Sequence, residues 1–233
     1  MIFLLSCLLT YEADRNRTVI EMEQTKAVRY VNYDRGNKSS VKITAMEDGL
    51  ITGHGSGNYF KIGKERFIIT AGHVIQGGSA FFIYDGDEIV YLETVHVDRY
   101  YDIAFLVPNR KLVNIKAVDY KTNRKQDILG LSVNYTGYPS DLPKTLFTGM
   151  ISHSGIGFAI MQSFAVPGSS GSIVFDNSGR VVGVLNAVKI GMYGLSPFPH
   201  LEENVVFIER LSNFNRKRIR GIMELWRKLN TSP

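Results

Sequence analysis

Cysteine is almost absent from this sequence, since Cys7 is the single one among 233 residues. No intramolecular disulfide can form, so the stability of the fold has to come from its hydrophobic core. This excludes the disulfide-rich extracellular scaffolds and favours a bacterial, viral or intracellular protein. It also excludes a zinc site built from cysteines, and the five histidines show no close ligand spacing. We therefore expect neither a metal ion nor any other cofactor.

A long hydrophobic run is also missing, since no segment approaches the roughly 20 apolar residues that span a bilayer. The first ten residues, MIFLLSCLLT, have the length of a signal-peptide apolar core. No lysine or arginine precedes this run, and no small-residue cleavage site follows it. An export signal and a true start at Met22 both stay open. Of the two locations, an intracellular, viral or host-cell one is slightly favoured over export.

The charge balance has no strong excess of one sign, because 27 basic and 22 acidic residues give a net charge of +5. Much of the basic excess lies near the C-terminus around the single acid Glu224: Arg216, Lys217, Arg218, Arg220, Arg227 and Lys228. A basic face can attract nucleic acid or an anionic membrane. A solvated helix face is the more ordinary explanation of such a run. We therefore do not expect this segment to bind nucleic acid or membrane.

Short β-branched and aromatic runs separated by turn residues dominate the chain and indicate an all-β fold. Twelve strands are predicted: 41–46, 50–62, 65–71, 79–85, 88–98, 102–107, 128–138, 145–153, 157–163, 171–176, 181–188 and 204–209. They divide into two groups of six around a polar stretch from Asn109 to Gln126. The predicted domains are an N-terminal arm (1–40, a signal or propeptide), a first barrel (41–115), a second barrel (116–212) and a basic C-terminal helix (213–233).

The C-terminal segment has a different periodicity. Ile219, Ile222, Met223, Trp226 and Leu229 recur at three- and four-residue spacing. That spacing places them on one face of an amphipathic helix. We expect this face to pack against the second barrel.

The segment with the most specific chemistry is PGSSGS, residues 167–172. Acyl transfer needs a nucleophile and hydrogen-bond donors aimed at the developing oxyanion. Ser170 can supply the nucleophile, and Gly168 lets the backbone turn so that the amides of Gly168 and Ser170 converge on one point. A polar Gly/Ser turn between strands is the alternative reading of the motif taken alone.

Two further segments supply a base and an acid. TAGHV ends a β-rich run at His73, where small neighbours leave room for an imidazole ring beside a cleft. DIAFL places Asp102 at the head of an apolar strand, where a carboxylate needs a partner to offset its desolvation. A histidine ring N–H is such a partner, and the hydrogen bond fixes the tautomer that a base requires. Singly, each could be a core histidine or a strand cap.

Together the three segments follow the order His, Asp, Ser, with separations of 29 residues (102 − 73) and 68 residues (170 − 102). In motif and order the chain resembles the chymotrypsin-like (trypsin-like) serine proteases over about residues 41 to 212. Its texture is nearest to the HtrA-like and V8-like bacterial branches and related viral proteases. Gly55-Ser56-Gly57 is similar to a strand of the compact bacterial members. The resemblance implies two six-stranded antiparallel Greek-key barrels and a C-terminal α-helix.

The same resemblance implies a serine endopeptidase acting on polypeptides, with Ser170 as nucleophile, His73 as base and Asp102 orienting that base. The implied oxyanion hole is formed by the amides of Gly168 and Ser170. The implied specificity pocket is formed by Phe164, Ala165, Asn186, Ala187 and Val188, and its apolar lining favours a small or medium apolar side chain before the cleaved bond. Ser169 stands where trypsin-like zymogens place an aspartate, so that activation switch is not expected.

Two other functions compete with this one. A catalytically silent double barrel could use its basic C-terminal helix as a binding module, although such a module has no need for all three residues. An α/β-hydrolase esterase requires the order Ser, Asp, His and is rejected. Removal of the N-terminal arm by self-processing stays an open hypothesis.

Overall fold

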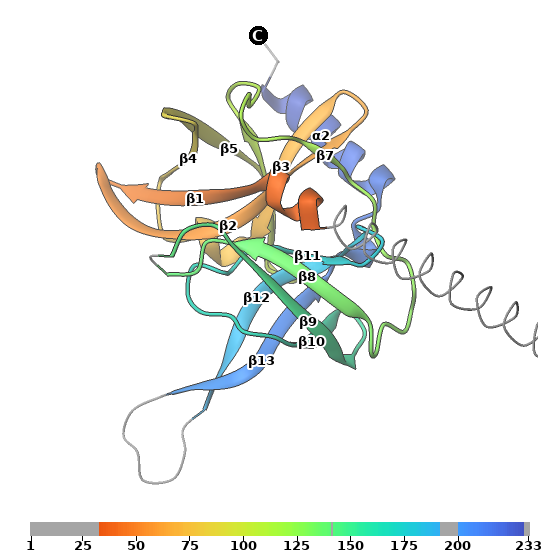
Figure 1. Cartoon of the computed structure of the whole chain (residues 1–233). Helices are drawn as coiled ribbons and strands as arrows, with labels where there is room; N and C mark the ends of the chain where they lie inside the picture. Colours follow the sequence, from red (N-terminus) through yellow and green to blue (C-terminus); the bar gives the residue numbers. More distant parts are fainter. Residues whose placement is uncertain (1–32, 141, 192–199, 231–233) are drawn as a thin grey trace, which may run out of the picture.

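The computed structural model describes residues 33–140, 142–191 and 200–230, and the side chains of 187–204 lie outside this description. Within these ranges the chain forms two β-barrels followed by a helix (Figure 1). The predicted all-β fold is confirmed. In the same ranges no helix has both the length and the apolar character needed to cross a membrane.

The first barrel contains the first six strands. Their bounds are β1 (Ser40–Glu47), β2 (Leu50–Ile62), β3 (Glu65–Ala71), β4 (Ala80–Asp85), β5 (Glu88–Asp98) and β6 (Ile103–Pro108). The strands pair in the order β1-β4-β5-β6-β3-β2, and antiparallel pairing of β1 with β2 closes the barrel. The two-residue strand β7 (Val118–Asp119) adds to β2 in parallel. The predicted domain boundary at 115/116 had assigned this strand to the second barrel, but its ladder ties it to the first.

The second barrel repeats this topology without any sequence repeat. Its strands are β8 (Ser132–Gly137), β9 (Thr145–Ser154), β10 (Phe158–Gln162), β11 (Ile173–Asp176), β12 (Val181–Gly191) and β13 (His200–Arg210). They close in the order β10-β13-β12-β11-β8-β9. In both barrels a Greek-key crossover connects the third strand to the fourth, and the loops that carry His73 and Ser170 lie in or next to these crossovers.

Each barrel has its own apolar interior, and a third apolar cluster joins the two. The joining cluster is rich in aromatic rings: Phe60 of the first barrel lies 6.3 Å, centroid to centroid, from Phe175 of the second. Tyr120, from the connection between the barrels, is fully buried there and donates its hydroxyl to the carbonyl of Phe214 at 2.8 Å. Burial of these large side chains fixes the barrels against each other.

The C-terminal helix α2 (Arg216–Asn230) packs on the first barrel, so the prediction that it docks on the second is wrong. After β13, the short 3-10 helix η2 (Leu211–Asn213) and the buried Phe214 carry the chain across the joining cluster. The periodic face then buries Ile219 and Met223 in that cluster. Ion pairs of Arg218 with Asp98 (β5) and Arg227 with Glu65 (β3) hold the helix in place.

The end of the predicted N-terminal arm is structured. Residues 33–39 are helical, and carbonyls of this segment accept hydrogen bonds from Asn58 of the first barrel and from Lys144, next to β9 of the second. Asn58 donates to Ser39 Oγ at 2.8 Å, and Arg35 donates to the carbonyl of Asp119. A polar sequence therefore packs through hydrogen bonds, which hydrophobic periodicity does not reveal. The remainder of the arm, with the first ten residues, Cys7 and Met22, lies outside the described residues.

Candidate active site

His73 and Asp102 are joined by two hydrogen bonds to one carboxylate. His73 lies in the 3-10 helix η1 (Gly72–Ile75), directly after β3. Its Nδ1 lies 2.7 Å from Asp102 Oδ2, and its backbone amide donates to Asp102 Oδ1 at 2.7 Å. The amide of Gly72 donates to the carbonyl of Asp102 at 2.8 Å. The acid therefore orients both the ring of His73 and the turn that carries it.

The backbone at Asp102 is in the left-handed region, with φ at 48°. Aspartate tolerates this region better than most residues. The conformation ends the turn, so β6 begins at Ile103 rather than at Asp102 as predicted. Gly72 packs against Asp102 and has to be glycine, because a Cβ at this position would lie 2.7 Å from Asp102 Oδ1. The small residue beside His73 thus makes room for the carboxylate as well as for the ring.

Ser170 lies on the loop between β10 and β11 and is fixed by main-chain contacts to both barrels. Its carbonyl accepts from the amide of Ser56 at 2.7 Å, and the next amide, Gly171, donates to the carbonyl of Leu185 at 2.7 Å. Gly171 has φ at 85°, and a Cβ there would lie 2.1 Å from Ser56 O. Only glycine fits this position, and it brings the loop against β2.

The loop in front of Ser170 is held by one buried hydroxyl. Ser56 Oγ donates to the carbonyl of Gly168 at 2.7 Å and accepts from the amide of Tyr138 at 2.9 Å. Gly168 has φ at 89°. The amides of Ser169, Gly171 and Ser172 all find carbonyl acceptors, whereas those of Gly168 and Ser170 have none within the described part of the chain. These two donors stay available to an oxygen from outside the protein.

His73 and Ser170 line the same cavity, of about 300 Å³, between the two barrels. Ser170 Oγ donates to the carbonyl of Asn186 at 3.4 Å, and among the described residues no hydrogen bond joins it to His73. An imidazole held by a carboxylate beside a serine hydroxyl can take the hydroxyl proton once the two groups meet. Catalytic hydrogen bonds of this kind often close only around a substrate.

Of the predicted specificity residues, the three with described side chains, Phe164, Ala165 and Asn186, do not line this cavity. Phe164 is 52% exposed, and its ring lies 5.8 Å, centroid to centroid, from that of Phe147. Ala165 is buried, and Asn186 is adjacent to Ser170 through the hydrogen bond above. Ala187 and Val188 lie on β12, but their side chains are outside the described ones.

Sequence reasoning missed two residues of the site. His54 of β2 lines the cavity, and its Nε2 is buried without a hydrogen-bond partner in the described part of the chain. Its ring lies against the loop, since a Cβ on Gly168 would be 2.7 Å from His54 Nε2. Ser56, the second, is the centre of the Gly55-Ser56-Gly57 motif. The motif was recognised, but its role as a clamp on the Ser170 loop requires the second barrel to be placed.

Glu209 of β13 has a strongly shifted pKa and interacts electrostatically with Asp102. Burial, followed by repulsion from the Asp102 and Asp98 carboxylates, raises the pKa of Glu209 from 4.5 to about 7. The negative charge that Glu209 adds to those of Asp102 and Asp98 therefore develops as the pH rises through about 7. In the described residues no three His, Cys, Asp or Glu side chains cluster closely enough to hold a metal ion.

Comparison with known proteins gives the class. Residues 55–184, more than half of the chain, match the family model of the trypsin-like peptidase domain. The chain therefore belongs to the trypsin-like peptidase family, and the family resemblance seen in its motifs is confirmed.

Among curated proteins the similarity is to DegP-like proteases. The chain is 32% identical over 166 residues, 67% of this chain and 32% of the relative, to a probable periplasmic serine endoprotease DegP-like of Bartonella henselae. It is 30% identical over 145 residues, 57% of this chain and 27% of the relative, to the protein of the same name from Brucella suis. The chain spans about a third of the length of these relatives.

Solved structures share the fold. The serine endoprotease from Yersinia pestis superposes with a TM-score of 0.66 at 20% identity, covering 83% of this chain and 65% of that one. The HtrA-type protease AlgW with tripeptide gives a TM-score of 0.66 at 20% identity, covering 84% of this chain and 64% of that one. At this identity the likeness establishes the double barrel and no more.

Proposed function

We propose that this protein is a serine endopeptidase that cleaves polypeptides through Ser170, His73 and Asp102. The observation that carries the proposal is that His73, held by two hydrogen bonds to the Asp102 carboxylate, lines the same cavity as Ser170. Membership of the trypsin-like peptidase family supports it, as do the names of the DegP-like relatives.

In the proposed reaction Ser170 Oγ first leaves the carbonyl of Asn186 by rotation about χ1 and meets His73 Nε2. Oγ then attacks the peptide carbonyl carbon while Nε2 takes its proton, and the Asp102 carboxylate stabilises the imidazolium. The C–N bond breaks as Nε2 returns this proton to the leaving amine. Water repeats the sequence and releases the acyl group from Ser170.

The amides of Gly168 and Ser170 are the proposed oxyanion donors. Both amides lack an acceptor among the described residues. The carbonyl of Gly168 is not available to them, because it accepts a hydrogen bond from Ser56 Oγ. Donors fixed before the reaction need no reorganisation as charge develops, and each is worth about 3 kcal/mol in comparable enzymes.

The proposed preference is for a small or medium apolar residue before the cleaved bond. The assigned pocket residues include no acid, which disfavours lysine and arginine side chains: Phe164, Ala165, Asn186, Ala187 and Val188. Ala165 supports an apolar base, because it is buried at 8% exposure in the apolar cluster of the second barrel.

A peptide library read by mass spectrometry tests this function. Wild-type protein should cut, and Ser170→Ala should not. Ser172→Ala is the matched control in the same motif, because its hydroxyl is buried without a partner in the described part of the chain and can be removed at little cost. If folded wild-type protein cuts nothing, the silent binding module becomes the better account. If Ser170→Ala cuts as wild type does, the nucleophile is wrong.

Export is the location we propose, because the relatives are named as periplasmic proteins. This differs from the slight preference for an intracellular location that the sequence alone gave. Fractionation of cells expressing the full chain tests it, with a cytoplasmic marker enzyme as the control. Recovery with the marker would contradict export.

Self-processing of the N-terminal arm is a separate proposal. It is tested by the intact mass of the protein, which should fall with time in wild type and not in Ser170→Ala.

A further inference from the structure

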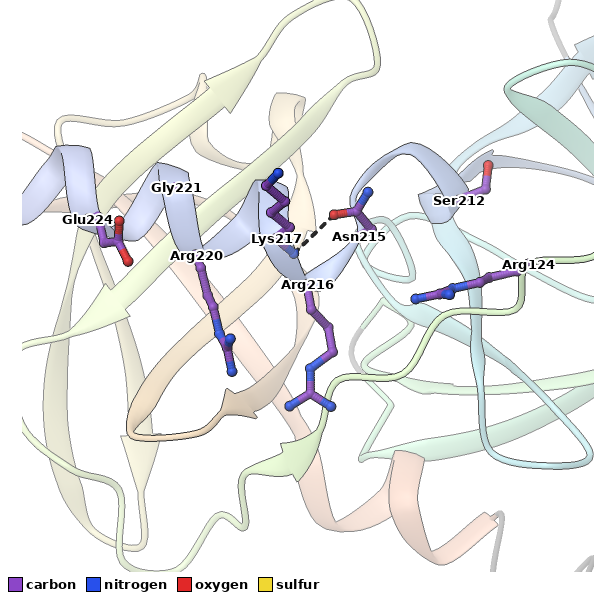
Figure 2. A pocket seen from close by; sticks show the side chains of 8 residues that line it. All are labelled: Arg124, Ser212, Asn215, Arg216, Lys217, Arg220, Gly221 and Glu224. Atoms are coloured by element: carbon purple, nitrogen blue, oxygen red, sulfur yellow. Dashed lines mark hydrogen bonds between the residues drawn. The ribbon is translucent and has the colours of Figure 1, made fainter.

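A second and larger cavity, of about 930 Å³, lies along the first turns of α2 (Figure 2). Eight residues line it: Arg124, Ser212, Asn215, Arg216, Lys217, Arg220, Gly221 and Glu224. None of them belongs to the cavity that holds His73 and Ser170. Among the residues that the structure describes, its lining contains four basic side chains, one acid and no aromatic ring.

A neighbouring cavity of about 470 Å³ extends the basic surface. It shares Arg124 and Arg216 with the first and adds Lys121, Thr122 and Arg180. Figure 2 shows Arg216 and Arg220 reaching from α2 toward one side, with Arg124 entering from a different segment. We call the two cavities together the basic trough. Its basic members are all exposed: Lys121, Arg124, Arg180, Arg216, Lys217 and Arg220.

These six cations have no carboxylate partner among the described residues. The contrast lies on the same helix, where Arg218 pairs with Asp98 at 3.2 Å and Arg227 with Glu65 at 2.8 Å. The positive charges on one face of α2 are therefore neutralised by acids of the first barrel. Those on the other face stay unneutralised around the basic trough. Like charges held this close repel one another, and an anionic ligand would relieve that repulsion.

The chemistry of the lining favours carboxylates of a polypeptide over nucleic acid. Single-stranded nucleic acids bind through aromatic rings that stack on bases, and the described lining of the trough has none. A duplex is a stiff rod, whereas a flexible polypeptide segment can follow the two cavities. Arginine forks match carboxylates in a bidentate geometry. Asn215 uses its Oδ1 to cap the amides of Lys217 and Arg218, which leaves its Nδ2 as a donor.

We propose that the basic trough binds an acidic segment of a polypeptide, rich in aspartate and glutamate, at a distance from the His73–Ser170 cavity. Binding itself does not depend on the proposed protease function. Its consequence does, since an acidic segment held there would recruit a substrate whose cleavage occurs elsewhere on the protein.

Fluorescence anisotropy of a labelled twelve-residue polyglutamate peptide tests the binding, with full-length Ser170→Ala protein so that nothing is cleaved. The trough variant carries Arg124→Gln, Arg216→Gln and Arg220→Gln. The control variant removes the same charge from exposed residues outside the trough: Lys42→Gln, Arg99→Gln and Lys111→Gln. We expect the trough variant to lose affinity about tenfold or more and the control to change less than about threefold. Affinity should also fall as salt rises.

Three results would overturn the proposal: no binding to the peptide, equal losses in both variants, or tighter binding of a single-stranded oligonucleotide of equal charge. All six substitutions are at exposed side chains, and equal melting temperatures confirm that the variants are folded. Arg124→Glu alone is a second variant that leaves α2 untouched. If the trough binds the acidic peptide but wild-type protein cleaves no peptide, the proposed protease function is contradicted and the binding proposal still stands.

Discussion

The carboxylate of Asp102 holds His73 at two points, through the ring nitrogen Nδ1 and through the backbone amide, each at 2.7 Å. The ring is thus oriented by the same group that fixes its main chain. Rotation of the imidazole away from Ser170 would break one hydrogen bond while the other still held the turn. The pair is therefore preorganised before any substrate arrives.

Replacing Asp102 by asparagine should separate orientation from charge. Asparagine tolerates the left-handed backbone at this position, and its Oδ1 can still accept from the amide of His73. If Asp102 has the proposed role, we expect a folded protein whose kcat falls about 10,000-fold, because the same change in a chymotrypsin-like triad leaves the histidine in the wrong tautomer. Peptide cleavage rates measure this. Asp98→Asn, which alters a nearby acid paired with Arg218, should keep the wild-type rate.

Ser56 should act as a positioning residue for the oxyanion loop. Ser56→Ala removes the hydroxyl that bridges the carbonyl of Gly168 and the amide of Tyr138, so we expect kcat to fall about tenfold or more with KM little changed. Both this variant and Ser40→Ala should lose about 1–3 kcal/mol of unfolding free energy. Ser40 donates to the carbonyl of Thr136 outside the loop, so its variant should retain kcat. Equal kcat in both would show that Ser56 is merely structural.

Gly171 should tolerate no side chain at all. Gly171→Ala adds a Cβ 2.1 Å from Ser56 O and 2.2 Å from Thr70 Oγ1, where backbone must move. Gly130 has a similar positive φ of 73° and open space around it, so Gly130→Ala measures the backbone strain alone. We expect a loss of about 1–2 kcal/mol for Gly130→Ala, and a loss several times larger or no folded protein for Gly171→Ala. Equal melting temperatures would contradict the close approach of this loop to β2.

Much of the fold was predictable because strand periodicity and turn residues are local signals. The predicted strands 50–62, 65–71 and 88–98 agree with β2, β3 and β5 to the residue. The predicted strand 128–138 is shorter in the structure, because residues 128–131 form the turn that precedes β8. The docking side of α2 was missed because amphipathicity identifies the buried face of a helix and not the partner that covers it.

Glu209 should make stability depend on pH. In the fold its pKa is raised from 4.5 to about 7, so the folded state binds more protons than the unfolded state between these values. The stability that this group contributes is therefore present below about pH 4.5 and lost as the pH rises through about 7. We expect Glu209→Gln to flatten the fall in melting temperature over this window and to be the more stable form by pH 8.

Melting curves between pH 5 and 8 measure the effect, with Glu224→Gln as the control because Glu224 is exposed on α2. The Glu224→Gln curve should run parallel to wild type. A Glu209→Gln curve that also ran parallel would contradict the raised pKa of Glu209 in the folded protein.

The site, like the fold, has a part that local sequence signals predict and a part that depends on long-range contacts. Ser170, His73 and Asp102 could be chosen from motifs and chain order, and the structure brings them to one place. His54 and Ser56 could not be assigned roles, because each lies next to Gly168, which is more than a hundred residues away in the chain. The helical segment at 33–39 was not predicted for the same reason, because the hydrogen bonds of this segment to Asn58 and Asp119 are long-range.

A fluorophosphonate probe followed by peptide mapping tests the central claim most directly, because the probe reacts with a serine only when a base activates it. The account predicts covalent labelling at Ser170 in the wild type and in Ser172→Ala, slowed by Asp102→Asn and abolished by His73→Ala and Ser170→Ala. Folded wild-type protein that stays unlabelled, or that is labelled at a serine other than Ser170, would contradict it.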